Sequence, residues 1–306
     1  MAPACARLAA VYHQLAPPPQ PTAAPTAGGG ALALVSRNLQ PSDLMFGGAP
    51  IGGVPFEQAE ATVHACLRAG IRHYDSAPLY SESEDKLGAA LLSASEETIG
   101  APCSFANGQL VVDGEPVYIY TKTGRLIRHR IESDAEDADE LAWRPAGPAH
   151  GPTMAQWPEP GAPRMVTDDF SANGAFLSFA ESRQRLGGGL AIDTLRIHDA
   201  DTVGGPGASQ ATGALDQALL PQGMLAGLRA LRKDGQIQKV SLGMNSHRQH
   251  RAPHSEDGLW TPEVITDFIE AAPKGTFDSA LLAYVSHRYL GRSDVMCISP
   301  LLPRRR

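Results

Sequence analysis

The stretch IRHYDSAPLYSESEDKLG, residues 71–88, contains the most specific pattern in the chain. Residues 71–74 predict a β-strand that ends where Asp75 begins, and Tyr80 follows in a loop that contains a proline. In a barrel of parallel strands, catalytic side chains lie at the C-terminal ends of strands and in the loops that follow. An isolated Asp and Tyr at such a place would more often be a helix cap and a half-buried aromatic residue. A catalytic interpretation therefore depends on the residues at the ends of the strands downstream.

Two further predicted strands end beside residues that can take part in proton transfer. One apolar run ends before TKTGR, which places Lys122 just past a strand end, and another ends before His198. A tyrosine hydroxyl has a pKa of about 10 and is a poor acid near neutral pH. Beside a lysine cation that a carboxylate holds in place, the phenolate is favoured and its pKa falls. We therefore expect four residues to form one proton-transfer site: Asp75, Tyr80, Lys122 and His198.

The chain resembles the aldo-keto reductase family in four motifs, which occur in the family's order and spacing: IRHYDSAPLY, YIYTKTGR, LRIHDAD and VSLGMNS. Two segments are also similar to the D-threo-aldose and L-galactose dehydrogenase branch of that family: AIDTLRIHDAD and DDFSANG. The resemblance extends from about residue 44 to residue 290. It implies a (β/α)8 TIM-type barrel, NAD or NADP bound at the barrel mouth, and catalytic roles for the four residues named above.

The resemblance also implies a reaction. That reaction would oxidise the anomeric carbon of a free aldose to a lactone and pass hydride to NAD or NADP. Tyr80 would act as the base, Lys122 and Asp75 would tune its pKa, and His198 would orient the substrate oxygen. A carbonyl or pyridoxal-type reductase that uses the same residues is an alternative, because loops set substrate choice on a common scaffold.

Two further residues are candidates for binding the cofactor. By the resemblance, Asn245 would hydrogen-bond the nicotinamide carboxamide, and its alternative role is that of a turn residue with positive φ. Gly48 lies in the loop GGAPIGG, residues 47–53, where glycines either allow close backbone approach to a ligand or form a simple turn. No GxGxxG motif follows a predicted strand, so the usual dinucleotide-binding fingerprint is absent.

Composition and charge argue against several other classes of protein. A length of 306 residues suits one large α/β barrel domain. A net charge of −7 does not suit a nucleic-acid-binding protein, which needs a basic face. No apolar run reaches the roughly 18 residues of a membrane span. The four cysteines are scattered, and the histidines of SHRQHRAPH fit a surface loop, so no metal site is expected. We expect a cytoplasmic protein whose partner is a small molecule, an aldose or another carbonyl compound.

The apolar runs predict about six of the eight strands of the barrel. Strands are expected at residues 44–46, 71–74, 117–120, 192–197, 237–242 and 277–285, with a further strand-like segment at 31–35. Helices are expected at residues 55–69, 84–92, 173–186 (capped by Ser171), 225–231 and 261–271. Strands seven and eight of the family and its phosphate-binding loop are not found, so NAD and NADP cannot be distinguished. A truncated, non-catalytic product is the alternative to an enzyme, and the oligomeric state stays open.

The remaining segments are expected to lie outside the barrel, which spans residues 31–290. Residues 1–30 are rich in Ala and Pro and predict a disordered tail, or an organellar targeting segment because they contain no acidic residue. Insertions are expected near 93–116, where NGQ and DGE favour a hairpin away from the chemistry, and near 126–167, which is predicted to be a loop. Trp143 and Trp157 in that loop either cover a substrate or anchor the surface. Residues 291–306 form a tail unlike the family, with at most one short strand, VMCIS.

Overall fold

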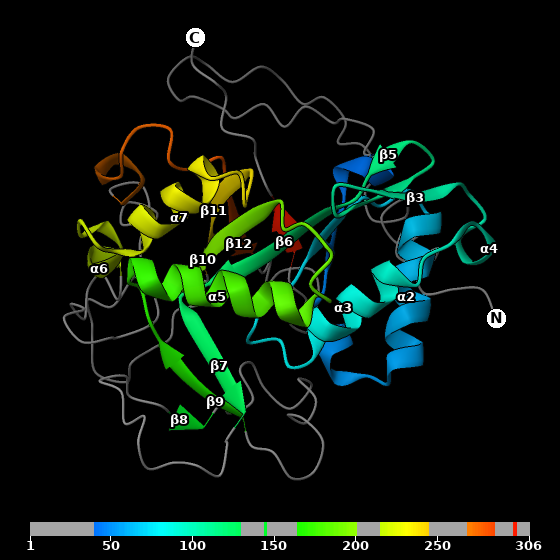
Figure 1. The fold of residues 1–306 in the computed structure, drawn as a ribbon, viewed down its shortest axis with the longest axis horizontal. Helices are drawn as coiled ribbons and strands as arrows, with labels where there is room; N and C mark the ends of the chain where they lie inside the picture. The colour runs from blue at the N-terminus through cyan, green and yellow to red at the C-terminus, as the bar shows by residue number, and fades with distance from the viewer. Residues whose placement is uncertain are drawn as a thin grey trace, which may run out of the picture.

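The computed structural model describes residues 40–129, 144–145, 164–200, 215–244, 268–284 and 296–298. Its centre is a curled sheet in which six parallel strands are neighbours in chain order, with helices outside the sheet (Figure 1). These strands are β1 (Met45–Gly47), β2 (His73–Asp75), β6 (Tyr118–Thr123), β10 (Thr194–His198), β11 (Lys239–Met244) and β12 (Ser279–Tyr284). The arrangement confirms the predicted incomplete (β/α)8 barrel. A seventh strand, β13 (Met296–Ile298), pairs antiparallel to β12.

Helices connect the parallel strands and cover one face of the sheet. The longer ones are α2 (Phe56–Arg68), α3 (Ser83–Leu92), α5 (Ala172–Arg185) and α7 (Met224–Lys233), and the shorter ones are η1 (Pro41–Asp43), η2 (Ala49–Gly53), α4 (Glu96–Ile99) and α6 (Leu215–Leu219). The predicted cap of α5 is confirmed, because the Ser171 hydroxyl accepts a hydrogen bond from the Gly174 amide at 3.0 Å. Helices α4 and α6 were not among the predicted elements.

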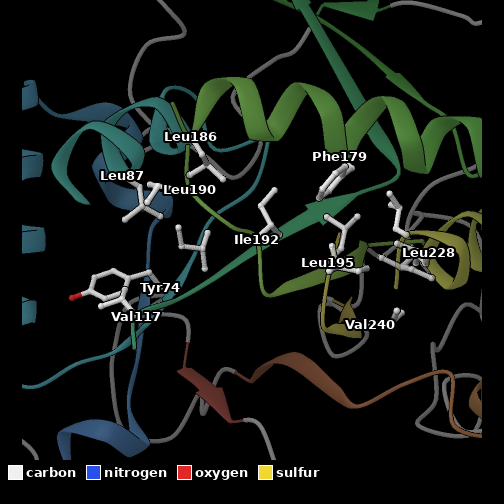
Figure 2. Close-up of a cluster of buried hydrophobic side chains, with 14 of the residues drawn as sticks. Tyr74, Leu87, Val117, Phe179, Leu186, Leu190, Ile192, Leu195, Leu228 and Val240 are labelled. Carbon is white, nitrogen blue, oxygen red and sulfur yellow. The ribbon is translucent and has the colours of Figure 1, made fainter. Parts of the chain in front are cut away.

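The hydrophobic core lies between these helices and the sheet. Figure 2 shows Phe179 of α5 and Leu186 at its end pointing toward Ile192 and Leu195, all of them buried. Side chains alternate along a strand, so the residues on either side of Leu195 in β10 point to the other, inner face. The outer face is thus apolar, and the inner face is free to carry charged side chains.

Two small antiparallel sheets extend from the barrel. Strands β3 (Cys103–Ala106), β4 (Gln109–Val112) and β5 (Glu115–Pro116) form the first, and the NG and DG turns join them as their sequence predicts. Strands β7 (Arg125–His129), β8 (Arg144–Pro145) and β9 (Arg164–Asp168) form the second. The prediction of a continuous loop over residues 126–167 is therefore wrong for these three segments, since β7 and β9 find partners in each other far along the chain.

Several boundaries differ from the predicted ones. Lys122 is the fifth of the six residues of β6, so the prediction that it lies just past the strand is wrong. The strand predicted at 237–242 runs from Lys239 to Met244. The segment 31–35, the tail 1–30, both tryptophans of the long loop and most of the helix predicted at 261–271 lie outside the described residues. Within the described ranges, no helix has the length and apolar content that a membrane crossing requires.

Candidate active site

The parallel register brings the predicted residues to the same end of the sheet. Asp75 is the last residue of β2 and pairs with Tyr120, while Lys122 pairs with Arg196 of β10. His198, the last residue of β10, lies two residues beyond Arg196. Because side chains alternate along strands, Asp75, Lys122 and His198 all point to the inner face, at the C-terminal ends of three neighbouring strands.

Asp75 and Lys122 form a buried ion pair. The Lys122 Nζ atom lies 2.5 Å from Asp75 Oδ2 and donates a second hydrogen bond to the Ser76 carbonyl at 2.7 Å. Lys122 is only 1% exposed and Asp75 only 3%. Burial alone would lower the pKa of Lys122, but attraction to Asp75 and Tyr80 and the hydrogen bond to Asp75 outweigh burial and raise this pKa. Lys122 is therefore a fixed cation.

Tyr80 lies between this cation and the histidine. The Lys122 Nζ atom is 4.5 Å from the centre of the Tyr80 ring, and the His198 ring meets the Tyr80 ring edge-on, with 5.7 Å between centroids. The structure thus brings together all four predicted catalytic residues. His198 Nε2 also lies 3.5 Å from Asp199 Oδ2, in the turn that follows β10.

The pKa of Tyr80 differs from the sequence-based expectation. Burial raises this pKa above the ordinary value of 10.0, and the carboxylates of Asp75 and Asp199 raise it further. Attraction and hydrogen bonding to Lys122 lower it but do not offset the other effects. The expectation that the lysine brings the pKa of Tyr80 below its ordinary value is therefore wrong for this arrangement, because it did not include the loss of hydration.

The loop that carries Tyr80 is held by the glycine-rich segment after β1. A Cβ atom on Gly52 would lie 2.0 Å from the Tyr80 carbonyl oxygen, so only glycine allows this approach. Lys86 of α3 donates hydrogen bonds to the carbonyls of Gly52 and Val54, at 3.0 and 2.8 Å. The segment that packs against the Tyr80 backbone is therefore itself held in place by α3.

Of the two predicted cofactor-binding residues, Gly48 lies in the described structure and Asn245 does not. The Gly48 amide donates to the Asp75 carbonyl at 2.7 Å, and its own carbonyl accepts from the Ser83 hydroxyl at 2.8 Å. A Cβ atom on Gly48 would lie 2.6 Å from the Asp75 carbonyl oxygen. This close backbone approach is made to the end of β2 within the protein, and a contact of Gly48 with a cofactor stays a prediction.

Sequence reasoning did not identify two buried arginines near the site. Arg196 Nε donates to Asp75 Oδ1 at 3.0 Å. Arg125 of β7 lies 3.6 Å from Asp199 Oδ2 through its Nη2 atom. An arginine between Leu195 and Ile197, two apolar strand residues, was the available signal for the first.

Within the described part of the chain, no group of three or more His, Cys, Asp or Glu side chains could hold a metal ion.

Comparisons with known proteins identify the family. The model of the Aldo/keto reductase family matches residues 43–259. The pyridoxal 4-dehydrogenase of Microbacterium luteolum is 30% identical over 259 residues, which cover 82% of this chain and 60% of that protein. This chain therefore spans about 60% of the length of that curated relative. Membership of the aldose dehydrogenase branch stays a prediction.

Two solved structures are similar at lower identity. The glycerol dehydrogenase of Gluconobacter oxydans is 19% identical, with a TM-score of 0.42 over 75% of this chain and 48% of that one. An aldo-keto reductase from Pseudomonas aeruginosa is 18% identical, with a TM-score of 0.39 over 67% of this chain and 56% of that one. Both scores are below 0.5, so the family is shown by the family model and the sequence match. On these two findings, the chain belongs to the aldo/keto reductase family.

Proposed function

We propose that the chain carries the proton-transfer site of a NAD- or NADP-dependent oxidoreductase that oxidises a cyclic hemiacetal to a lactone, as at the anomeric carbon of a free aldose. The observation that carries the proposal is the position of Tyr80, with the Lys122 cation 4.5 Å from its ring and His198 edge-on to it. Family membership supports the general class of reaction, which interconverts a hydroxyl and a carbonyl group.

Each of the four residues has a task in this reaction. Oxidation of a hydroxyl removes a proton from oxygen and a hydride from carbon. Tyr80 takes the proton as a phenolate, and Lys122, held in place by Asp75, stabilises the phenolate charge. His198 holds the substrate oxygen within reach of Tyr80. In the reverse direction a protonated Tyr80 donates to the carbonyl oxygen, which suits its raised pKa.

The donor set at the strand ends fits a nicotinamide cofactor. Tyr80 and His198 can move a proton and hold an oxygen atom, but neither side chain can accept two electrons from carbon. The cofactor would supply the hydride transfer when bound, and the protein residues would supply the proton and the orientation. Asn245 and Gly48 are the residues that we propose to contact it.

The proposed substrate class, cyclic hemiacetals, includes both the predicted aldoses and pyridoxal. Free aldoses exist in water mainly as cyclic hemiacetals, and pyridoxal also closes to a cyclic hemiacetal through its neighbouring hydroxymethyl group. The relative named above is a pyridoxal 4-dehydrogenase, so pyridoxal is the second substrate to test. A hemiacetal hydroxyl presents the same oxygen and hydrogen to Tyr80 in both compounds.

The proposal is tested by the rate of formation of reduced nicotinamide with L-galactose, L-fucose, D-arabinose or pyridoxal, each with NAD and with NADP. Tyr80→Phe should lower the rate by about 100-fold or more, because it removes the proton-accepting group. Tyr118→Phe is the matched control: it removes a hydroxyl from the inner face of β6, outside the site, and should retain the rate. Full activity of Tyr80→Phe, or neither turnover nor nucleotide binding by the folded chain, would overturn the proposal.

A further inference from the structure

Arg196 is a fully buried cation in the middle of β10. It is 1% exposed, and its neighbours Leu195 and Ile197 point into the hydrophobic core. By alternation its side chain lies on the inner face, in register with Lys122 of β6 on one side and Ser241 of β11 on the other. A buried guanidinium stays charged, so it needs partners there.

The partners of Arg196 come from several strands of the sheet. Its Nε atom donates to Asp75 Oδ1 at 3.0 Å, and Nη1 donates to the Ser241 hydroxyl at 2.6 Å. Its Nη2 atom is 3.5 Å from the sulfur of Met45. The guanidinium carbon lies 4.8 Å from the centre of the Tyr120 ring, a cation–π contact. Contacts with β1, β2, β6 and β11 therefore fix the position of the guanidinium group.

One carboxylate is shared between two cations. Lys122 binds Asp75 Oδ2, and Arg196 binds Asp75 Oδ1. An isolated Asp–Lys pair would carry no net charge, whereas this set of three carries one positive charge in excess. Tyr80 is the next group along from Lys122, whose Nζ atom lies 4.5 Å from the centre of the Tyr80 ring.

We propose that Arg196 is a positioning residue for proton transfer by Tyr80: by holding one oxygen of Asp75, it prevents that carboxylate from fully neutralising Lys122. This inference rests on the function proposed above. In the described part of the chain, the charged and titratable groups that face Tyr80 are Lys122 of β6, Asp75 of β2, and His198 with Asp199 at the end of β10. Arg196 adds a positive charge behind Asp75 and so favours the Tyr80 phenolate.

The test is a spectroscopic pH titration, which needs no turnover. The phenolate absorbance of the full chain minus that of Tyr80→Phe gives the titration of Tyr80 alone. Arg196→Gln removes the charge and keeps hydrogen-bonding groups near Asp75 and Ser241. We expect it to move the midpoint of the Tyr80 titration upward by roughly one pH unit, because a positive charge has been removed. Arg196→Lys keeps the charge and should leave the midpoint within a few tenths of a unit of its original value.

Arg185→Gln is the matched control. Arg185 is also a mostly buried arginine bound to a buried carboxylate, Glu84, at 2.6 Å, but it lies between α5 and α3 on the helix side of the sheet. Its replacement should leave the Tyr80 midpoint unchanged. If Arg196→Gln does not move the midpoint, or moves it no further than Arg185→Gln does, the inference is wrong. If Arg196→Gln does not fold, a shift in Arg196→Lys as large as one pH unit would also contradict it, since the charge is still there.

Turnover and titration together separate the role of Arg196 from the proposed function. Full turnover by Tyr80→Phe overturns the function, whatever the titration shows. Loss of turnover in Tyr80→Phe, together with an unchanged Tyr80 midpoint in Arg196→Gln, overturns only the role of Arg196. Where turnover is measurable, the pH at which the oxidation rate is half-maximal should shift upward in Arg196→Gln and return in Arg196→Lys.

Discussion

Tyr80 should make the two directions of the reaction respond differently to pH. Burial is the largest cause that raises its pKa above 10.0, and the carboxylates of Asp75 and Asp199 add to it. Below that raised pKa the hydroxyl is protonated, so the rate of carbonyl reduction should be constant through neutral pH and fall only above about pH 10. Oxidation needs the phenolate, so its rate should rise about ten-fold per pH unit below that pKa. Initial rates between pH 6 and pH 10 in both directions check this, and an oxidation rate that levels off near pH 7 would contradict it.

We expect Lys122 to stabilise the Tyr80 phenolate, and not only to contribute to the stability of the sheet. Lys122→Met removes the cation next to Tyr80 and leaves Asp75 paired with Arg196. The pKa of Tyr80 should rise further, and the oxidation rate at pH 8 should fall by about 100-fold or more. Lys239→Met is the control, because Lys239 is a more exposed lysine of β11 that lies 5.5 Å from the Tyr118 ring centre. Equal losses in the two variants would speak against a specific role for Lys122.

At the scale of elements, the contact between η2 and the Tyr80 loop should set the geometry of the site. Gly52→Ala places a methyl group 2.0 Å from the Tyr80 carbonyl oxygen, so the loop has to move. A displacement of about 1 Å in a reacting group costs on the order of 100-fold in rate, and we expect such a loss in kcat with the folded structure retained by circular dichroism. Gly47→Ala, whose Cβ would meet nothing within 4 Å, is the matched control and should keep its activity. Similar rates for both variants would show that the loop tolerates the shift.

A second element-scale prediction concerns the buried link between α3, α5 and β6. Glu84 accepts a hydrogen bond from Thr121 at 2.5 Å and another from Arg185 Nε at 2.6 Å. Arg185→Met leaves a carboxylate that is 1% exposed without its cation, which should lower the free energy of unfolding by about 3–5 kcal/mol. Arg183→Met, at an exposed position of the same helix, should change it by less than about 0.5 kcal/mol. Urea titrations of the two variants make the comparison.

The sequence predicted the elements better than it predicted which face of each strand is charged. Apolar runs gave the six parallel strands to within a few residues, because strands buried under helices are rich in such residues. The same runs did not show which side chains point to the barrel interior, because the alternation of apolar and polar residues along them is incomplete. Lys122 was therefore predicted to lie past the end of its strand, and Arg196 was overlooked. Strands β7 and β9 were missed because Arg125 pairs with Asp168, a partner too distant in sequence for a local turn signal.

At the scale of the whole molecule, the sheet has two ends among the described strands. β1 pairs only with β2 there, and β13 covers the other side of β12 in the antiparallel direction. A closed barrel would have no such edges, whereas unpaired strand edges expose hydrogen-bonding groups that favour association between chains. The short antiparallel strand β13 therefore caps β12, because it pairs with the edge of β12 that would otherwise expose hydrogen-bonding groups.

A chain that ends at residue 290 lacks β13 and should show what this cap contributes. Three paired residues are lost from the edge of β12, a contribution on the order of 1–2 kcal/mol, so the melting temperature should fall by about 2–8 °C. The newly exposed edge should also make the truncated chain self-associate with rising concentration, which sedimentation velocity detects. A chain that ends at residue 300 keeps β13 and is the matched control. If both truncated chains melt and sediment as the full chain does, β12 needs no cap, and some other part of the molecule must protect that side of the sheet.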